Sequence, residues 1–298
     1  MATKKIATPA EEKDTAEGAV VVAAQFAVSA PVDDSFLEQF AGSGMDGADA
    51  ESFAIPFLAV LQKTSPVADP DDAAYIEGAR AGMLFETVSR SMYDGKAGVH
   101  IVPCAYKREF IRWGADDGNE TYKGAYTPEA VVQMREEGTV RELDNRLYFP
   151  LPDGTVSEKK CDRLSDTRNH YILLLNPDGG WVRALMSLSS TQIKKSKHLM
   201  SALSNVKLRG AAGMYTPPTF ASVVLAQTKL EQNDKGSWHG LQFSLVDRAR
   251  KMMTQDIFND AKAFYEEVRK GSVAANYDAA QAAQGQGPAG AADAADGF

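Results

Sequence analysis

Aromatic and cationic side chains alternate along the run from Val99 to Trp113. Side chains two residues apart on a strand point to the same face. One face of this run would therefore carry Tyr106, Arg108, Phe110 and Arg112. Rings can stack on bases while guanidinium groups neutralise phosphates, which is the combination that single-stranded nucleic acid requires. The spacing predicts a binding face, although the two rings would instead be core if the arginines lay at the rim of a barrel.

Further aromatic and basic residues could extend such a face. Trp238 falls on the polar side of the expected strand Ser237–Val246, where an indole is either a stacking platform or half-buried under a long loop. Trp181 and Arg183 repeat the pairing of a ring with a cation. Lysines of the helix expected after Ser189 form the densest basic patch, which contacts either phosphates or only solvent. The residues expected to contact DNA are Tyr106, Lys107, Arg108, Phe110, Arg112, Trp113, Arg168, Trp181, Arg183, Lys194, Lys195, Lys197, Lys207, Arg209, Lys235 and Trp238.

The distribution of charge along the chain is more informative than the net charge of -8. Residues 151–251 hold 15 Lys and Arg against 8 Asp and Glu, whereas residues 1–100 hold 7 against 16. A basic segment between acidic flanks is the electrostatic footprint expected of a protein that contacts phosphates. The composition alone is equally compatible with an ordinary solvated surface.

A small β-barrel would position these residues. Apolar runs and turn signals predict strands over Val99–Trp113, Asn169–Leu175, Trp181–Leu188, Thr219–Lys229 and Ser237–Val246. The second and third of these form a hairpin, because a strong turn signal separates them. One helix is expected between the third and fourth strands, and another after the fifth. This is the order of an OB-fold, so we expect a mainly β chain with helices, an OB-fold-like five-stranded barrel with insertions and disordered termini.

The two ends of the chain differ in composition from its centre. Residues 1–50 are rich in Ala, Gly, Ser and acidic residues, and we expect a disordered N-terminal arm with a short helix around Phe36–Phe40. Residues 51–272 form the expected OB-like nucleic-acid-binding domain. Residues 273–298 are expected to be a flexible linker and acidic tail ending in Phe, because the segment after Tyr277 contains no large apolar residue before the terminus.

The last residues of the tail could bind a partner protein. Asp293, Asp296 and Phe298 place acidic groups beside a terminal ring and carboxylate. Such a group would suit a basic pocket with an apolar slot on another protein, unless the terminus is arbitrary.

The linker at 279–292 and the tip ending in Phe298 resemble those of single-stranded-DNA-binding proteins from bacteria and bacteriophages. The segments 55–66, 191–197, 215–220 and 235–240 also look like those of uncharacterised phage replication-region proteins. The resemblance implies a protein that coats single strands during phage DNA replication and recombination. It further implies that the strands are protected from nucleases and that polymerase or helicase is recruited through the tail.

Little in the sequence supports an enzyme. No phosphate-binding Gly loop, nucleophile elbow or metal-ligand spacing occurs. A metal-dependent nuclease is the weaker alternative, and it would use Asp162, Asp166, Asn169 and His170. The stronger alternative is a virion structural or scaffolding protein whose terminal segments are assembly arms.

Neither a metal nor a cofactor is expected, since Cys104 and Cys161 are too few for a zinc cage. A disulfide framework, a signal peptide and a membrane span are all absent from the sequence, which favours the cytoplasm of the host cell. The expected partners are single-stranded DNA and phage or host replication proteins. The sequence leaves open whether the chain forms a homo-oligomer.

Overall fold

The computed structural model describes residues 33–48, 52–116, 119–234, 236–246, 252–273, 275 and 277. It divides into two compact units, Met1–Gly47 and Ala48–Phe298. The described part of the first unit contains helix α1 (Asp34–Glu38), which is capped by the Asp33 side chain accepting a hydrogen bond from the backbone N–H of Ser35. The sequence predicts a short helix at this place. Residues 1–32 of the expected arm lie outside the described part.

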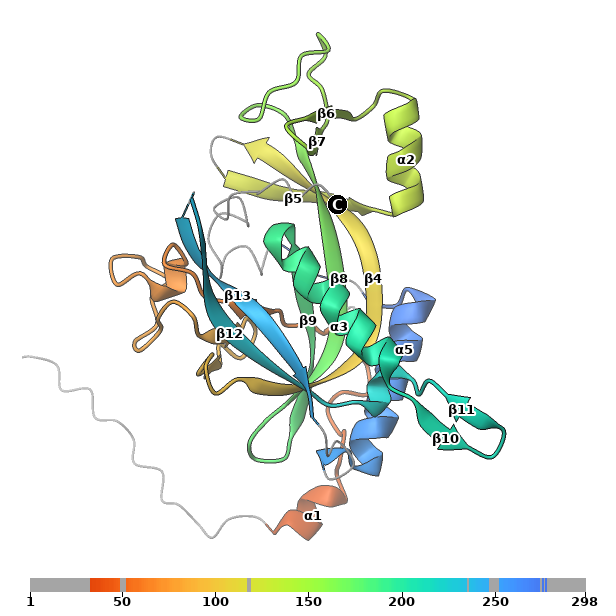
Figure 1. The fold of residues 1–298 in the computed structure, drawn as a ribbon. Coiled ribbons are helices and arrows are strands. Elements are labelled where there is room, and N and C mark those ends of the chain that lie inside the picture. Colours follow the sequence, from red (N-terminus) through yellow and green to blue (C-terminus); the bar gives the residue numbers. More distant parts are fainter. Residues whose placement is uncertain are drawn as a thin grey trace, which may run out of the picture. The chain divides into compact units, whose positions relative to one another are not determined.

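Three antiparallel strands form the centre of the second unit (Figure 1). β4 (Val99–Asp116) pairs with β8 (Arg163–Leu175), and β8 pairs with β9 (Trp181–Ser189). The turn between β8 and β9 contains Gly179 at a φ of 92°, a left-handed conformation that favours glycine. The predicted hairpin is confirmed.

A second hairpin extends this sheet. β12 (Val224–Asn233) pairs with β13 (Gly236–Leu245), and the start of β12 also pairs with the start of β4. The resulting order β13-β12-β4-β8-β9 is a Greek key, because the fourth strand returns to lie beside the first. Helix α3 (Ile193–Asn205) lies across the open side of the curled sheet in Figure 1. Among the described strands no pairing joins β13 to β9, so the sheet is a half-barrel.

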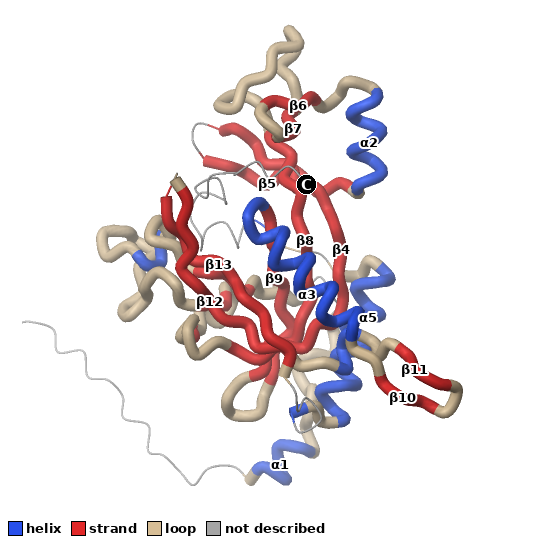
Figure 2. Tube along the Cα trace, viewed as in Figure 1, coloured by secondary structure: helices blue, strands red, loops and turns tan. Residues whose placement is uncertain are grey.

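Insertions surround the half-barrel. The sequence predicts a long insertion with one short helix over 114–145, and this segment contains β5 (Asn119–Tyr126) and α2 (Pro128–Glu136). The hairpin of β6 (Arg141–Leu143) and β7 (Arg146–Tyr148) then joins the start of β8. The remaining elements include β10 (Leu208–Gly210), β11 (Gly213–Tyr215) and α5 (Gln255–Lys270), which are labelled in Figure 2. The others are β1 (Leu58–Val60), β2 (Leu84–Glu86), β3 (Met92–Tyr93) and the 3-10 turns η2 (Pro66–Ala68), η3 (Ser190–Gln192) and η4 (Thr219–Ala221).

Alternate residues of β8 contribute to two cores on opposite sides of the sheet. Tyr171 and Leu173 belong to a cluster with Phe264 of α5. Ile172 and Leu174 belong to a second cluster with residues of α3, which include Leu199 and Leu203. Both faces of β8 are buried, which explains why this strand appears in the sequence as a continuous apolar run.

The chain returns to the core after α5. Tyr277 is buried, and its ring stacks on that of Tyr122 with centroids 5.1 Å apart. Its hydroxyl accepts a hydrogen bond of 2.6 Å from Asn169 Nδ2. Within the segment that the sequence assigns to a linker, Tyr277 packs in the core, because a large ring gains stability by leaving water. The residues after Tyr277 lie outside the described part.

The prediction of a mainly β chain with helices is confirmed, with an OB-like Greek-key sheet curled into a half-barrel. None of the described helices combines the length and the apolar character that crossing a bilayer would require.

Candidate nucleic-acid interface

The alternating residues of β4 lie on one face of the sheet. The register between β4 and β8 places Tyr106 opposite His170 and Arg108 opposite Arg168. The rings of Tyr106 and His170 are 5.2 Å apart, and the guanidinium carbon of Arg108 lies 5.2 Å from the centroid of the Phe110 ring. Tyr106 is 37% exposed and the Arg108 side chain 40% exposed. Tyr106 and Arg108 are therefore accessible rather than core, while Phe110 is half-buried.

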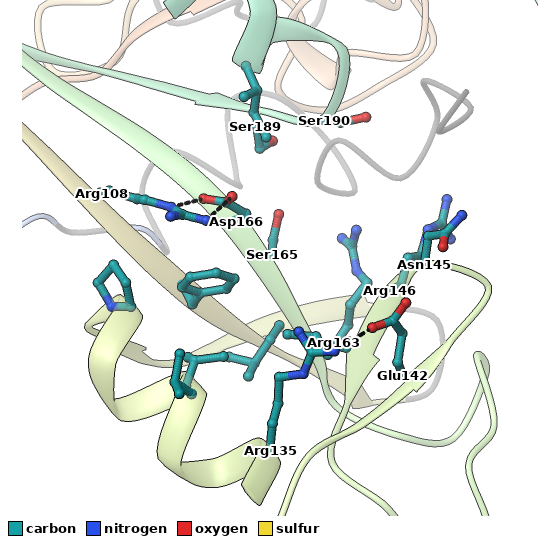
Figure 3. Close-up of a pocket in the computed structure, with 17 residues that line it drawn as sticks. Arg108, Arg135, Glu142, Asn145, Arg146, Arg163, Ser165, Asp166, Ser189 and Ser190 are labelled. Carbon is teal, nitrogen blue, oxygen red and sulfur yellow. Dashed lines mark hydrogen bonds and ion pairs between the residues drawn. The ribbon is translucent and has the colours of Figure 1, made fainter. Parts of the chain in front are cut away.

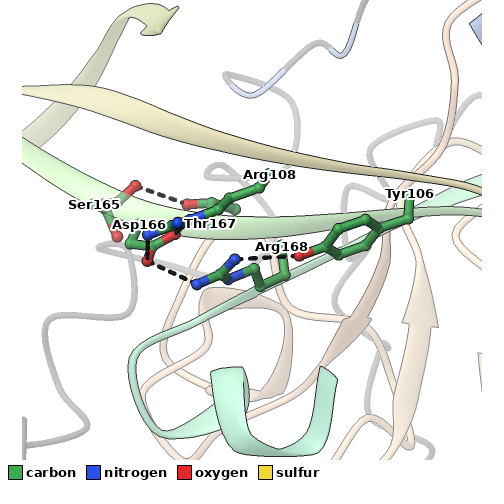
Figure 4. A network of polar contacts seen from close by, with 6 residues as sticks. All are labelled: Tyr106, Arg108, Ser165, Asp166, Thr167 and Arg168. Atoms are coloured by element: carbon green, nitrogen blue, oxygen red, sulfur yellow. Dashed lines mark hydrogen bonds and ion pairs between the residues drawn. The ribbon is translucent and has the colours of Figure 1, made fainter. Parts of the chain in front are cut away.

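Hydrogen bonds and ion pairs hold this face together (Figure 4). Asp166 accepts hydrogen bonds from Arg108 Nη2 at 2.8 Å and from Arg168 Nη2 at 2.9 Å. Arg168 Nη1 donates to the Tyr106 hydroxyl at 3.2 Å. The hydrogen bond with Asp166 raises the pKa of Arg108 above its ordinary value. Since two guanidinium groups share one carboxylate, the cluster keeps an excess of positive charge.

Arg112 forms a second cluster further along β4. Its Nε donates to Asp162 Oδ2 at 2.7 Å, and its guanidinium carbon lies 3.9 Å from the centroid of the Phe149 ring. Lys123 Nζ is 3.6 Å from the other oxygen of Asp162. Two cations again share one carboxylate, so this cluster is also positively charged.

The face of β4 continues into a pocket of about 410 Å³, which lies in the size range of small-molecule sites (Figure 3). Four guanidinium groups line it, from β4, α2, β7 and β8, against two carboxylates. The pocket thus has a formal excess of two positive charges. Its charged lining residues are Arg108, Arg135, Arg146, Arg163, Glu142 and Asp166.

Helix α3 adds basic residues next to this pocket. Ile193 at its start lines the pocket, and Lys194 and Lys197 are exposed in the turn that follows. Lys195 instead forms an ion pair with Glu231 of β12. Two of the three helix lysines expected to contact DNA are therefore exposed near the pocket, and the third connects α3 to β12.

The other two basic residues predicted in this region lie beyond the far end of α3. Lys207 donates a 3.0 Å hydrogen bond to the backbone oxygen of Ser204, and Arg209 is exposed on β10. The thirteen residues of α3 span about 20 Å, which separates these two residues from the pocket. Figure 1 shows their hairpin at the opposite end of α3 from α2.

The side chains of Lys107 and Trp113 point away from the face of β4 that carries Tyr106. Lys107 Nζ lies 5.7 Å from the ring centroid of Tyr171, which belongs to the core on the α5 side. Trp113 is 8% exposed and packs edge-on to Tyr122. Neither side chain lies on the Tyr106 face, because side chains one position out of phase point to the opposite face of a strand.

Trp181 and Arg183 hold helix α5 against the sheet. Trp181 Nε1 donates to Asp260 at 2.8 Å, and Arg183 donates to Asp260 at 2.6 Å and to Glu267 at 2.8 Å. One cation faces two carboxylates here, so the site has an excess of negative charge. Both side chains, which the sequence predicts as DNA contacts, bind α5 in the folded chain.

Trp238 lies in β13, opposite Glu231 in the ladder with β12. It is half-buried, and its ring Nε1 is buried without a hydrogen-bond partner in the described part of the chain. No ring contact or hydrogen bond between described residues connects it to Tyr106 or Arg108. Lys235 and the tail residues Asp293, Asp296 and Phe298 lie outside the described residues.

The four residues considered for a nuclease do not share a site. The carboxylates of Asp162 and Asp166 are occupied by the cations described above. Asn169 is fully buried and bonds to Glu109 at 2.6 Å, while His170 is buried and bonds to Ser196 at 2.7 Å. Within the described ranges, no group of three or more His, Cys, Asp or Glu could hold a metal ion.

The structure adds two pocket residues that the sequence did not single out, Arg135 and Arg146. Arg135 is in the last turn of α2, where a basic residue is ordinary because it complements the helix dipole. Arg146 opens the short strand β7. Only the arrangement of the insertion in space brings these two side chains to the pocket.

A family model described as Pam3 phage gp34-like protein matches residues 24–274 of the chain. No curated protein and no solved structure matches the chain. The matched stretch contains every described helix and strand from α1 to α5, and so includes both the half-barrel and the pocket.

Proposed function

The chain belongs to the Pam3 phage gp34-like protein family, and we propose that it is a non-enzymatic protein that binds single-stranded DNA. The observation that carries this proposal is the face of β4. It presents an exposed ring at Tyr106 and a guanidinium at Arg108, and it leads into the positively charged pocket. Exposed rings beside cations suit unpaired bases and their phosphates.

The ion pairs of the face leave room for a phosphate. Arg108 offers five N–H donors, of which Asp166 takes two. A phosphate can pair with Arg108 while Arg168 retains Asp166, because the two guanidinium groups share that carboxylate. The DNA strand therefore gains a charge-assisted hydrogen bond, and the Asp166 carboxylate keeps a cationic partner in Arg168.

Binding of oligo-dT should be micromolar or tighter at low salt and should weaken steeply as salt rises. Each phosphate contact on a single strand contributes about -0.7 to the slope of log affinity against log salt, so three or four contacts predict a slope of roughly -2 to -3. Fluorescence anisotropy at several salt concentrations measures this slope. Affinity that is insensitive to salt, or equal for duplex DNA, would contradict the proposal. Absence of binding together with presence in purified virions would favour a structural role in the particle.

Replacing Tyr106 by Ser should weaken oligo-dT binding by about tenfold or more, since each stacked base contributes roughly 1–3 kcal/mol. Tyr106→Phe should keep most of the affinity, because it retains the ring and loses only the hydrogen bond with Arg168. The matched control is Tyr215→Ser, which removes a tyrosine that is 50% exposed on β11. Equal losses for Tyr106→Ser and Tyr215→Ser would argue against stacking at Tyr106.

The proposal includes a role in phage DNA replication and recombination, in the cytoplasm of the host cell. The chain would coat and protect single strands, and the tail with Asp293, Asp296 and Phe298 would recruit a polymerase or helicase. The support for the tail's role is chemical, since an acidic segment with a terminal ring suits a basic pocket with an apolar slot.

A further inference from the structure

The pocket at the end of the β4 face has more positive charge than one internal phosphate of a strand would neutralise. Its four arginines face two carboxylates. An internal phosphodiester carries a single negative charge, whereas a phosphomonoester carries about -1.5 to -2 at pH 7. We propose that this pocket binds a terminal nucleotide through its phosphomonoester, at the end of a DNA strand.

The arginines converge on the pocket from elements far apart in the sequence (Figure 3). Arg135 pairs with Glu142 at 2.8 Å, and the two side chains are 53% and 45% exposed. Such an exposed pair contributes little stability, so a phosphate can replace Glu142 at low cost. Arg146 pairs at 2.6 Å with Glu158, which does not line the pocket. Arginine forks suit phosphate oxygens because they can donate two parallel hydrogen bonds.

Part of the remaining wall of the pocket is apolar, and this part favours a nucleotide over a bare phosphate. Phe110 lies under the guanidinium of Arg108, and Val131, Leu147 and Leu164 surround it. An apolar wall opposite a few polar groups is the usual arrangement of a small-molecule site, and the volume of about 410 Å³ fits that class. The sugar and base would contact this wall while the phosphate contacts the arginines.

The insertion between the first two strands of the half-barrel builds much of this site. α2 contributes Arg135 and Val131, and the β6–β7 hairpin contributes Arg146 and Leu147. The two turn residues of that hairpin have left-handed φ values, and one of them, Asn145, also lines the pocket. The five strands of the Greek key do not require this insertion, so its contribution to the pocket gives it a role in ligand binding.

The experiment compares short oligo-dT strands that end in a phosphate at the 5′ end, a phosphate at the 3′ end, or hydroxyl groups only. Each competes with a fluorescent oligo-dT, as do thymidine monophosphate and inorganic phosphate in separate arms. One phosphorylated end is expected to bind about tenfold more tightly than the hydroxyl end, the effect of one or two charge-assisted hydrogen bonds. The two phosphorylated arms identify which end is bound. Inorganic phosphate should compete far less well than the mononucleotide.

Three variants test whether the pocket causes the preference. Arg135→Gln should abolish the gain from the terminal phosphate, read as the ratio of the affinities for phosphate-ended and hydroxyl-ended strands. Glu142→Gln should increase the gain several-fold, because it removes a negative charge from the lining. Arg141→Gln is the control, since Arg141 is an exposed arginine of the same hairpin that does not line the pocket. It should retain the full preference.

The inference rests on the proposed function for its ligand, but the two can fail separately. Equal affinity for all three strands would overturn the terminal-phosphate site and leave single-strand binding intact. Binding of thymidine monophosphate without any binding of oligo-dT would overturn the proposed function and support the nucleotide pocket. Equal competition by inorganic phosphate and the mononucleotide would overturn the role of the apolar wall.

Discussion

Replacing Tyr277 by Ala is expected to lower the free energy of unfolding by roughly 3–5 kcal/mol, the range observed when a large buried ring is removed. The ring contacts Phe57, Trp113 and Tyr122, with centroids 5.3, 6.1 and 5.1 Å away. Its removal would leave a cavity between β4, β5 and the segment before β1. Urea unfolding followed by tryptophan fluorescence measures the loss, since Trp113 lies beside the cavity.

Two controls separate the ring from its hydroxyl and from the tail. Tyr277→Phe should cost about 1–2 kcal/mol, because it keeps the ring and removes the hydroxyl that accepts the hydrogen bond from Asn169. A chain ending at Ala280 should be as stable as the full chain, since it retains Tyr277. Unchanged stability in Tyr277→Ala, or a large loss in the chain ending at Ala280, would contradict the packing of Tyr277.

Acidification should destabilise the half-barrel through His170. Burial, with a smaller contribution from the charge of Arg168, lowers the pKa of His170 to about 4. The unfolded chain takes up this proton near its ordinary pKa of 6.5, whereas the folded chain resists it down to about pH 4. The stability due to the neutral ring is therefore complete above pH 6.5 and is lost as the pH falls from 6.5 to 4. The shift corresponds to roughly 3 kcal/mol.

The pH dependence arises from a specific contact between the sheet and α3. His170 Nε2 is hydrogen-bonded to Ser196 Oγ of α3 at 2.7 Å, and the Tyr106 ring packs against the imidazole. Unfolding at a series of pH values should show a steeper loss between pH 6.5 and 4 in the native chain than in His170→Gln, which does not titrate. Parallel curves for the two proteins would show that His170 is not the group responsible.

The fold was largely predictable because most of its signals are local. The turn after β8 and the apolar runs on both sides of it specify a hairpin within about twenty residues. The pairing of β12 with β4 joins Val224 to Ile101, and no local pattern specifies a contact over that distance. The OB-like order could be recognised only because the number and succession of elements matched a known arrangement. The role of Tyr277 was missed because one ring in an Ala-rich segment has no periodicity.

The candidate site was predictable only where one strand supplies it. The spacing of Tyr106, Arg108 and Phe110 was enough to place them on one face. Their neutralising partner Asp166 lies on β8, and its pairing depends on the register between two strands. Arg183 illustrates the opposite case, since its partner Asp260 is 77 residues away and no local pattern in the sequence predicts this contact with α5.

The position of α5 late in the described part of the chain has a consequence for biosynthesis. Leu185 of β9 packs in the same core as Ile257 of α5, which is made 72 residues later. At a synthesis rate of about 5–20 residues per second, the apolar surface around Leu185 stays exposed for roughly 4–14 s before Ile257 of α5 is synthesised. During this interval the growing chain exposes a sheet face that can associate with other nascent chains. We therefore expect the yield of folded protein to depend on chaperones and on the rate of translation downstream of β9.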